Sequence, residues 1–380
     1  MPTGIIAEYD PFHRGHAYHA AQAADEGGVV AVMSGNFTQR GQAALFDKRA
    51  RVAAALENGV DLCIELPVVW ACAAAEDFAK GGVALLRAIG CDRIAFGSEC
   101  GSAQRLSDAA RAVREADGEA IREGVQLGLT YPNALARAVG ADTAQLLSNP
   151  NDTLACEYIN AAFSLGYSPS LLPILRKGAE HNSSSVCDGY ASASFIRDEA
   201  KAGRDFTQLL PEGCAFLASA PRSDEQAADR TLLYLLRALS PERIAAAEGF
   251  SEGLENRVLR AAAQSTSFAE VAQKVKSKRY TLARIRRLLL RALIGIDKAA
   301  LPDTPPYIRV LGLNERGAAI LGRIKKDFPI LTKPADYKSL SAECQAVFEC
   351  ELRAAELYAL TLPCAPAGGE MRYTPVIKKD

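Results

Sequence analysis

Three of the four histidines in this chain, His13, His16 and His19, lie close together near the N-terminus, directly after an apolar run. If a helix begins near Gly15, its free N–H groups and its dipole favour an anion, and two imidazoles three positions apart can reach that anion together. Gly15 also lets the backbone approach a ligand, because it carries no Cβ. We therefore predict a phosphate site in which His13 and His16 stabilise the charge that builds up on phosphate during adenylyl transfer.

Two other interpretations of these histidines stay open. A metal site is one, since spacings of three can bring the imidazoles onto one helical face. A transition metal would require further ligands, however, and His181 is the only other histidine. The other interpretation is that the histidines are structural or exposed. Phosphate contact is the prediction that we carry forward, and no metal ligand is assigned.

The first half of the chain alternates short apolar runs with helical patterns, which is typical of a parallel sheet wound by helices. Strands are expected at Thr3–Tyr9, Val29–Met33, Val60–Leu66, Arg93–Gly97 and Leu171–Arg176. Helices are expected at Gly15–Glu26, Phe46–Asn58, Ala71–Ile89 and Thr153–Leu165. The predicted fold class is therefore α/β, with a Rossmann-like parallel sheet.

Polar residues follow several of these strands, namely Asp10–His16, Ser34–Phe37, Gly97–Glu99 and Arg176–Gly178. Because ligands collect at the carboxyl ends of parallel strands, we expect these residues to converge on one crevice. Gly97 would let the backbone approach a nucleotide. Arg176 would offer a planar fork for phosphate, a role that Lys177 could share. Ser34–Phe37 could bind a small acid, and Asp47 and Lys48 at the next helix start could contact nucleotide or RNA.

A largely polar stretch, Ala220–Gln226, marks a change in the pattern of the chain. Beyond it the strand–helix alternation stops, and helices are expected at Thr231–Leu239, Pro241–Ala247, Glu255–Ala263, Phe268–Lys276 and Thr281–Ile294. A chain of 380 residues exceeds the usual size of one hydrophobic core. We therefore predict an α/β domain over residues 1–205 and a mainly helical domain over residues 206–380.

The stretch from Lys274 to Arg291 has eight basic residues and no Asp or Glu, although the net charge of the chain is −1. Tyr280 lies inside it and could stack on a base. Apolar residues at helical spacing would dock one face of the helix, so that the arginines point largely outward. A solvated charged face is the alternative, but the absence of acidic residues favours contact with RNA phosphates. Such contacts position an RNA without reading its sequence.

Several ordered blocks carry a resemblance to a known family. His13-x-Gly15-His16 after a strand resembles the H-x-G-H signature of the nucleotidylyltransferase superfamily. Four blocks are similar to the tRNA(Met) cytidine acetate ligase family, and they are Gly4–His19, Ala31–Gly41, Gly59–Pro67 and Phe96–Glu99. The similarity continues at Pro150–Asn151, Arg176–Lys177, Ala191–Arg197 and Lys278–Arg287, and so covers nearly the full chain.

The resemblance implies a reaction. Members of that family use ATP to activate acetate as acetyl-adenylate and then acetylate the wobble cytidine of elongator tRNA(Met), giving N4-acetylcytidine. Residues 1–205 would then bind ATP, with Mg²⁺ accompanying it, and residues 206–380 would bind the tRNA. The match carries ATP contacts onto Ile6, Ala7, Glu8, Tyr9, Asp10, Pro11, Phe12, His13, Arg14, Gly15, His16, Ala17, Tyr18, His19, Gly97, Asn151 and Arg176.

Further site residues follow from the same comparison. Ser192 and Ser194, which precede Ile196 and Arg197, are similar to the serine-rich helix start followed by Ile-Arg in small-molecule nucleotidylyltransferases. Hydroxyls at a helix start can bind phosphate, but plain N-capping is an equal alternative. The RNA contacts would come from the basic helix, through Lys278, Arg279, Arg284, Arg286 and Arg287.

Some positions depart from the family pattern. The family usually has Asn where this chain has Asp10, often Asn at the position of Arg14, and an aromatic residue followed by His-Asp at Glu180–Asn182. Asp10 could hold a water of Mg²⁺ or disturb the phosphate electrostatics, and Arg14 could compensate the added charge. These departures bear on fine tuning more than on the class of reaction.

Two alternative functions are an adenylyltransferase that acts on a small phosphate ester in coenzyme synthesis and a non-catalytic RNA-binding protein. The first would not need the basic helical region, and intact His13, Gly15 and His16 weigh against the second. The sequence has no run of about 18 uncharged apolar residues and no N-terminal secretory pattern. We therefore expect a cytoplasmic protein without a membrane partner.

Overall fold

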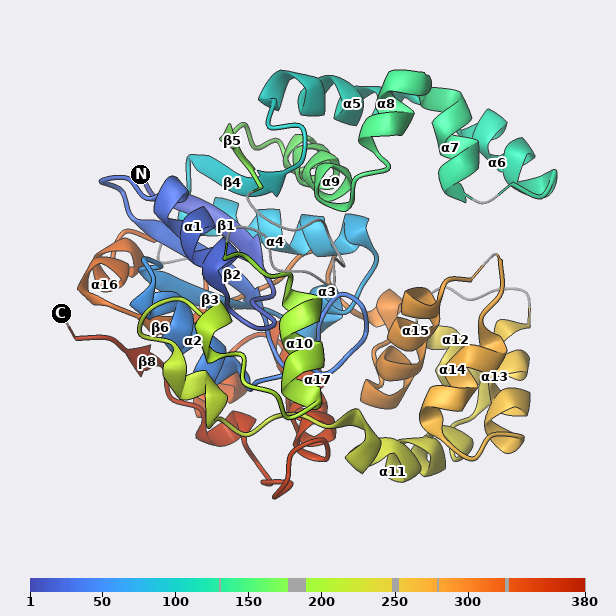
Figure 1. Cartoon of the computed structure of the whole chain (residues 1–380). Coiled ribbons are helices and arrows are strands. Elements are labelled where there is room, and N and C mark those ends of the chain that lie inside the picture. Colours follow the sequence, from blue (N-terminus) through green and yellow to red (C-terminus); the bar gives the residue numbers. More distant parts are fainter. Residues whose placement is uncertain (130, 177–188, 248–252, 279, 325–327, 380) are drawn as a thin grey trace.

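The computed structural model describes residues 1–129, 131–176, 189–247, 253–278, 280–324 and 328–379. Its strands form one sheet in the order β5-β4-β1-β2-β3-β6-β7, and β8 pairs with β6 (Figure 1). The strands are β1 Thr3–Ala7, β2 Val29–Ser34, β3 Leu62–Leu66, β4 Arg93–Ser98, β5 Ser170–Leu175, β6 Ile308–Leu313, β7 Ile330–Leu331 and β8 Val376–Ile377.

The strands β5, β4, β1, β2 and β3 run parallel to their neighbours. Every residue of β2 and of β3 is buried, because helices cover both faces of the sheet. The chain winds from β1 through β2 to β3 and then crosses to β4 and β5 on the other side of β1, so the strand order reverses at β1. The predicted Rossmann-like α/β fold is confirmed, and each expected strand overlaps an observed one.

Helices on the two sides of the sheet enclose two separate cores. The alternation of side chains along β2 divides them, since Val30 and Val32 belong to one core and Val29, Ala31 and Met33 to the other. The first core takes in α3 Val68–Ala71, α4 Ala75–Ile89, α5 Ala103–Glu115 and α9 Pro150–Ser164. The second takes in α1 Arg14–Ala23, α2 Lys48–Glu57 and α10 Ala193–Lys201.

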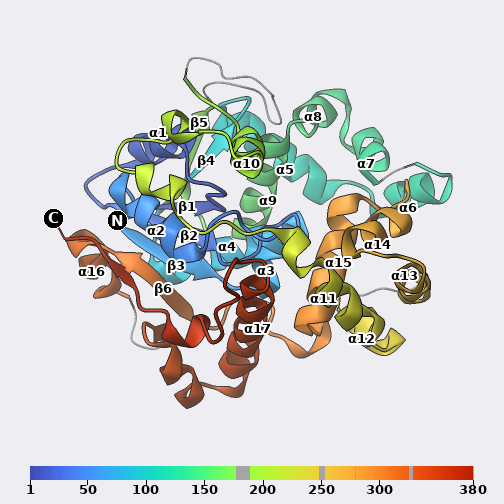
Figure 2. The ribbon, with the colours of Figure 1, turned by 60° about the horizontal axis from the view of Figure 1, so that its bottom comes forward.

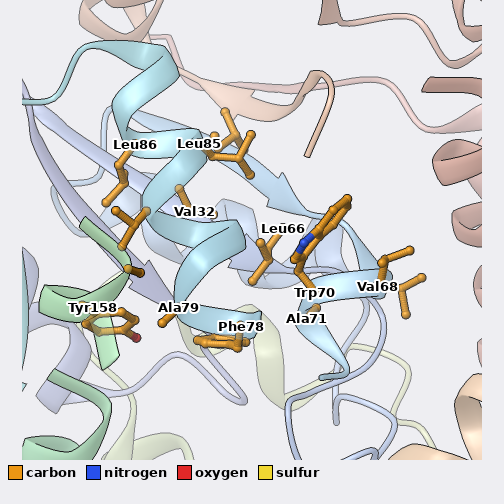
Figure 3. Packing of buried hydrophobic residues seen from close by; sticks show 14 of the residues in the cluster. Val32, Leu66, Val68, Trp70, Ala71, Phe78, Ala79, Leu85, Leu86 and Tyr158 are labelled. Carbon is orange, nitrogen blue, oxygen red and sulfur yellow. The ribbon is translucent and has the colours of Figure 1, made fainter. Parts of the chain in front are cut away.

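Figure 3 shows the first core from close by, where α4 carries Phe78 and Leu86, and Tyr158 of α9 lies near the Phe78 end of that helix. The chain continues outward from α5 as an arm made of α6 Gly118–Gln126, α7 Tyr131–Val139 and α8 Ala141–Leu146 (Figure 1). The single helix expected at Ala71–Ile89 is wrong at its start. Ala74 has an extended backbone with ψ 162°, so α3 ends before it and α4 begins after it.

The helices expected after the polar stretch are confirmed and form a compact body with its own core. They are α11 Glu225–Arg237, α12 Pro241–Ala246, α13 Leu254–Ala263, α14 Phe268–Val275 and α15 Leu282–Ile294. Figure 2 shows this body beside the sheet region rather than across one of its faces. Arg291 of α15 docks the two parts, because its guanidinium donates to the carbonyls of Ala247 and of Val69 in α3, at 2.9 and 2.7 Å.

The C-terminal part of the chain returns to the sheet, which the sequence analysis did not predict. Strand β6 pairs antiparallel with β3, and β7 and β8 pair with β6. The other elements of this part are α16 Glu315–Leu321 and α17 Ala342–Ala359, and short 3-10 turns lie at Thr207–Leu209, Ala215–Ala218, Lys298–Ala300, Pro334–Ser339 and Glu370–Arg372. The division of the chain at residue 205 stays a prediction, with residues 308–377 adding strands to the sheet of the first part.

Candidate functional site

A pocket of about 410 Å³ opens at the carboxyl ends of the parallel strands. Its walls come from the loop after β1, from Gly97 of β4, from the end of β5 at Arg176 and from the start of α10. These segments meet where the strand order reverses, which is the place where open α/β sheets bind their ligands. The predicted convergence of strand ends on one crevice is therefore observed for β1, β4 and β5.

The His13-x-Gly15-His16 segment forms the start of α1. His13 is the N-cap residue, and its Nδ1 accepts a hydrogen bond from the backbone N–H of Gly15 at 3.0 Å. The Nδ1 of His16 accepts in turn from the backbone N–H of His13 at 3.3 Å. This reciprocal capping stacks the two rings, with centroids 3.9 Å apart and planes inclined by 22°. Gly15 leaves the room for it, because a Cβ there would lie 2.8 Å from Cε1 of His13.

The capping bonds also decide where the imidazole protons are. A nitrogen that accepts a hydrogen bond from N–H carries no proton, so a neutral ring of His13 or His16 has its proton on Nε2. Burial, followed by the charges of Arg176 and Arg197, lowers the pKa of His13 to about 3. Burial and the neighbouring histidines hold the pKa of His16 well below its usual range. The free protein thus offers two neutral Nε2–H donors at the pocket.

His19 lies one turn further along α1 and also lines the pocket. Burial lowers its pKa to about 4. Among the described residues, no group of three His, Cys, Asp or Glu side chains is arranged to hold a metal ion.

Most residues that the family resemblance assigns to ATP do line this pocket. Those that line it are Ile6, Ala7, Glu8, Tyr9, Asp10, His13, Gly15, His16, Tyr18, His19, Gly97, Asn151, Arg176, Ser194 and Arg197. Pro11, Phe12, Arg14 and Ala17 are not among the lining residues. Phe12 packs instead in the core, with its side chain fully buried. Lys177 lies outside the described residues.

Glu99, which follows β4, orients two of the pocket residues. Its carboxylate accepts from the side-chain amide of Asn151 at 2.6 Å and lies 3.8 Å from the guanidinium of Arg176. It also accepts from the backbone N–H of Asp152 at 3.1 Å. The carboxylate therefore connects the start of α9 with the end of β5. Among the described residues, a Cβ at Gly97 would meet only Cγ of Arg176, at 3.7 Å, so none of them requires glycine there.

Asp10 is held by the protein on both sides. One carboxylate oxygen accepts from the backbone N–H of Leu45 at 2.7 Å, and the other lies 3.5 Å from the guanidinium of Arg197. Arg14, which we expected to compensate the charge of Asp10, points elsewhere. It donates to the carbonyls of Leu210 and Gly189 at 3.3 and 3.4 Å. The compensating cation is Arg197, because it is the arginine that the fold places against Asp10.

The start of α10 supplies the opposite wall. Ser192 is the N-cap and accepts from the backbone N–H of Phe195 at 3.1 Å, which is the capping role left open from the sequence. The hydroxyls of Ser192 and Ser194 lie 2.9 Å apart, and both residues line the pocket. Glu180–Asn182, the third departure from the family pattern, lie outside the described residues.

One loop of the pocket was not identified from the sequence. Thr38, Gln39, Arg40 and Gln42 line it, whereas the preceding Ser34–Phe37, which we considered for a small acid, do not. The block Ala31–Gly41 contained the necessary signal, since it belongs to the family resemblance. Phe78, Tyr158 and Tyr190 were also missed, because an aromatic residue in an apolar pattern looks like any core residue.

Lys48 is not at the pocket. Its ammonium group is buried against the carboxylate of Glu65, at 2.7 Å, and also contacts Glu370. The side chain therefore has a structural role at the start of α2, rather than the contact with nucleotide or RNA that we considered. Asp47 caps the same helix, accepting from the backbone N–H of Ala50 at 2.8 Å.

The basic helix is only partly exposed. Lys278 and Arg284 are exposed, and Arg286 is half-buried. Arg287 donates to the backbone carbonyl of Gln39 at 3.1 Å, so it points toward the pocket loop. Arg291 is 2 % exposed, and the expectation that the arginines point largely outward is wrong for it. Arg279 lies outside the described residues.

A parallel sheet whose reversal point carries a capped His-x-Gly-His helix start defines the class of nucleotidyl transferases. The family model described as HIGH Nucleotidyl Transferase matches residues 1–370 of the chain. Among the described residues, no helix has the length and apolar character needed to cross a membrane.

Comparison with individual proteins identifies the family more specifically. The tRNA(Met) cytidine acetate ligase of Thermoanaerobacter sp. (strain X514) is 37 % identical, with 99 % of each chain covered. The protein of the same name from Caldanaerobacter subterraneus subsp. tengcongensis is 38 % identical, with 94 % of each chain covered. The crystal structure of apo Thermotoga maritima TmcAL superposes with a TM-score of 0.92 at 30 % identity over all of both chains. The same protein bound with alpha-thio ATP gives a TM-score of 0.89, at the same identity and coverage. This chain belongs to the tRNA(Met) cytidine acetate ligase family.

Proposed function

We propose that this protein uses ATP to activate acetate as acetyl-adenylate and then transfers the acetyl group to the wobble cytidine of elongator tRNA(Met), giving N4-acetylcytidine. The observation that carries the proposal is the stacked pair of His13 and His16 at the start of α1, facing a pocket at the sheet reversal point. The names of the full-length relatives add the identity of the acyl group and of the RNA.

Activation is the first half of the reaction. The phosphates of ATP would lie at the N-terminus of α1, where the helix dipole and the Nε2–H donors of His13 and His16 favour negative charge. An acetate oxygen then attacks the α-phosphorus, and the bond to pyrophosphate breaks. Arg176 and Arg197 line the same pocket and can stabilise the charge that develops on the departing pyrophosphate.

Mg²⁺ would accompany the phosphates of ATP in this proposal. Asp10 does not fit the role of its ligand, because its two carboxylate oxygens already face the Leu45 N–H and the Arg197 guanidinium. A magnesium ion of this kind usually keeps several waters and is held mainly by the substrate.

The tRNA would bind along the exposed side of α15 and the residues before it. Lys278, Arg284 and Arg286 are the described residues proposed to contact RNA phosphates, and Arg279 belongs to the same basic run. Tyr280 lies beside Arg284, with the guanidinium carbon 5.1 Å from the ring centroid. Replacing one phosphate-contacting residue should weaken RNA binding about uniformly across RNA sequences. It should also lower the slope of the logarithm of the binding constant against the logarithm of the salt concentration by about one.

The reaction would take place in the cytoplasm.

The test is to incubate the protein with ATP, labelled acetate and purified elongator tRNA(Met), then to digest the RNA and look for labelled N4-acetylcytidine. A tRNA transcript with uridine at the wobble position is the control and should stay unlabelled. Label that enters acetyl-adenylate but no RNA would refute the tRNA assignment. If no acetate-dependent exchange of pyrophosphate with ATP occurs either, the activation half is refuted too.

A further inference from the structure

Glu8 is a carboxylate at the pocket, within the segment that the family resemblance assigns to ATP, and the activation step described above gives it no chemical role. It directly follows the last residue of β1 and is half-buried in the pocket wall. Its Oε1 accepts a hydrogen bond from the backbone N–H of Gln39 at 2.6 Å. Because like charges repel, this carboxylate would not contact the phosphates of ATP, which leaves it to contact the nucleoside or the second substrate.

The loop above Glu8 connects it with the basic helix. The carbonyl of Gln39 accepts from the guanidinium of Arg287 in α15 at 3.1 Å, while the N–H of Gln39 donates to Glu8. Gly41, in the same loop, lies directly against the backbone of α15, since a Cβ there would be 2.6 Å from N of Arg287. Glu8 therefore lies on the side of the pocket that faces the helix at which we propose that tRNA binds.

The second half of the proposed reaction needs a proton acceptor. The N4 amine of cytidine attacks the acetyl carbonyl of acetyl-adenylate, a C–N bond forms, and the bond from that carbon to the phosphate oxygen breaks so that AMP leaves. The attacking nitrogen must lose one proton to become the amide. We propose that Glu8 accepts this proton, an inference that rests on the proposed function.

Two of the three histidines of the pocket and its other described carboxylate are less suited to the task. The Nδ1 atoms of His13 and His16 already accept backbone hydrogen bonds, which leaves their Nε2–H groups as donors. Asp10 is the only other carboxylate among the described lining residues, and it is held by Leu45 and Arg197. A general base must lie within reach of the proton that it removes, and Glu8 is the carboxylate that the fold leaves for this position.

The surroundings of Glu8 favour basicity. Burial is the largest effect and raises the pKa of Glu8. The Gln39 N–H and the guanidinium groups of Arg197 and Arg40 lower this pKa, Asp10 raises it, and the net shift is upward. Tyr158 of α9 is also close enough to feel the charge of Glu8. Only the ionised carboxylate accepts a proton, so the rate of acetyl transfer should rise with pH through the raised pKa of Glu8 and then level off.

The experiment separates the two half-reactions in the full-length protein. Acetate-dependent exchange of labelled pyrophosphate into ATP measures activation, and single-turnover transfer from preformed acetyl-adenylate to tRNA measures the second step. The variants are Glu8→Gln and Glu8→Asp, with Glu349→Gln on the exposed side of α17 as the matched control.

Glu8→Gln should lower transfer by about 10²-fold or more and exchange by much less, as expected for loss of a general base. Its transfer rate should no longer rise with pH, Glu8→Asp should restore part of the rate and of the rise, and Glu349→Gln should behave as wild type. Transfer by Glu8→Gln that keeps the wild-type rate or pH profile would overturn the inference. Equal losses in exchange and transfer would do so as well. Failure of the proposed function is a different result, because wild-type protein would then acetylate no tRNA.

Discussion

At the scale of single residues, the two imidazoles at the start of α1 are oriented by the backbone that they cap. Because His13 and His16 each use Nδ1 as an acceptor, rotation of either ring would leave an N–H of the first turn without its partner. The hydrogen bonds that cap the start of α1 are therefore the same bonds that orient the two rings. A ligand phosphate would meet donors that need no rearrangement.

The protonation of these rings can be measured in the free protein. With pKa values of about 3 for His13 and about 4 for His19, both rings should stay neutral between pH 5 and 8. An unfolded chain protonates its histidines near pH 6.5, so folding stability from these residues is present above that pH and is lost as pH falls below it. Nitrogen NMR of the imidazoles should show a proton on Nε2 of His13 and no titration in this window. A midpoint near 6.5 would contradict the burial argument.

Removal of one donor should affect activation directly. His16→Ala takes away an Nε2–H group and one capping acceptor, and loss of a single preorganised donor commonly costs about 10²- to 10³-fold in rate. We expect a loss of that size in acetate-dependent pyrophosphate exchange. Thermal unfolding should be recorded alongside, so that the lost cap is not mistaken for lost chemistry. A well-folded variant with full exchange activity would rule out the phosphate role of His16.

At the scale of elements, the loop Thr38–Gln42 joins the pocket to the helical body. Its backbone donates to Glu8 on one side and accepts from Arg287 on the other. Gly41 has a φ of +70°, a conformation that costs other residues about 1–2 kcal/mol. The close approach of Gly41 to α15 means that a movement of this helix would displace the pocket wall.

Gly41→Ala tests this coupling. The new Cβ would lie 2.6 Å from the backbone nitrogen of Arg287, so the loop must move away from α15. We expect acetyl transfer to tRNA to fall several-fold more than pyrophosphate exchange. Gly166→Ala is the matched control, since Gly166 has a φ of +60° and no described residue lies within 4 Å of its Cβ position. If both variants behaved alike, strain alone would explain the effect and the coupling would be disproved.

At the scale of the whole molecule, a buried ionic cluster ties the C-terminal part to the sheet. It consists of Lys48, Glu65, Arg309, Glu351 and Glu370, all at most 4 % exposed. Lys48 contacts Glu65 and Glu370, and Arg309 lies 3.6 Å from Glu370. Burial alone would lower the pKa of Lys48, but the carboxylates of Glu370 and Glu65 raise it above its usual value. The cluster joins α2 and β3 to β6, α17 and the turn Glu370–Arg372.

Lys48→Met should destabilise the protein strongly, because it removes the cation that contacts both Glu65 and Glu370 and leaves Glu370 with Arg309 as its only described cation, at 3.6 Å. Breaking a buried ion pair from one side costs about 3–5 kcal/mol. Denaturant unfolding at neutral pH measures the loss directly. Lys201→Met, at the exposed end of α10, is the control and should change the free energy of unfolding by less than about 0.5 kcal/mol. Equal stability of the two variants would show that the cluster does not hold the C-terminal part in place.

The sequence alone was sufficient for features that depend on neighbours in the chain. The strands β1 to β5, the helices of the second half and the His13-x-Gly15-His16 helix start follow from local periodicity, turn residues and capping chemistry. The family blocks placed Gly97, Asn151 and Arg176 at the site, and all three line the pocket. Local sequence patterns predict these strands, helices and caps because each one depends on residues only a few positions apart.

Tertiary structure alone decided which distant residues meet. The pairing of β6 with β3, the bond from Arg287 to Gln39 across 248 positions and the choice of Arg197 to face Asp10 join segments far apart in sequence. The identity of a side chain does not tell which distant residue it contacts. From the sequence Lys48 was therefore considered as a ligand-binding residue, whereas the fold buries it against Glu65. Side chains that are far apart in sequence meet only when the chain packs, and only then does the backbone of Gln39 link Glu8 to the basic helix.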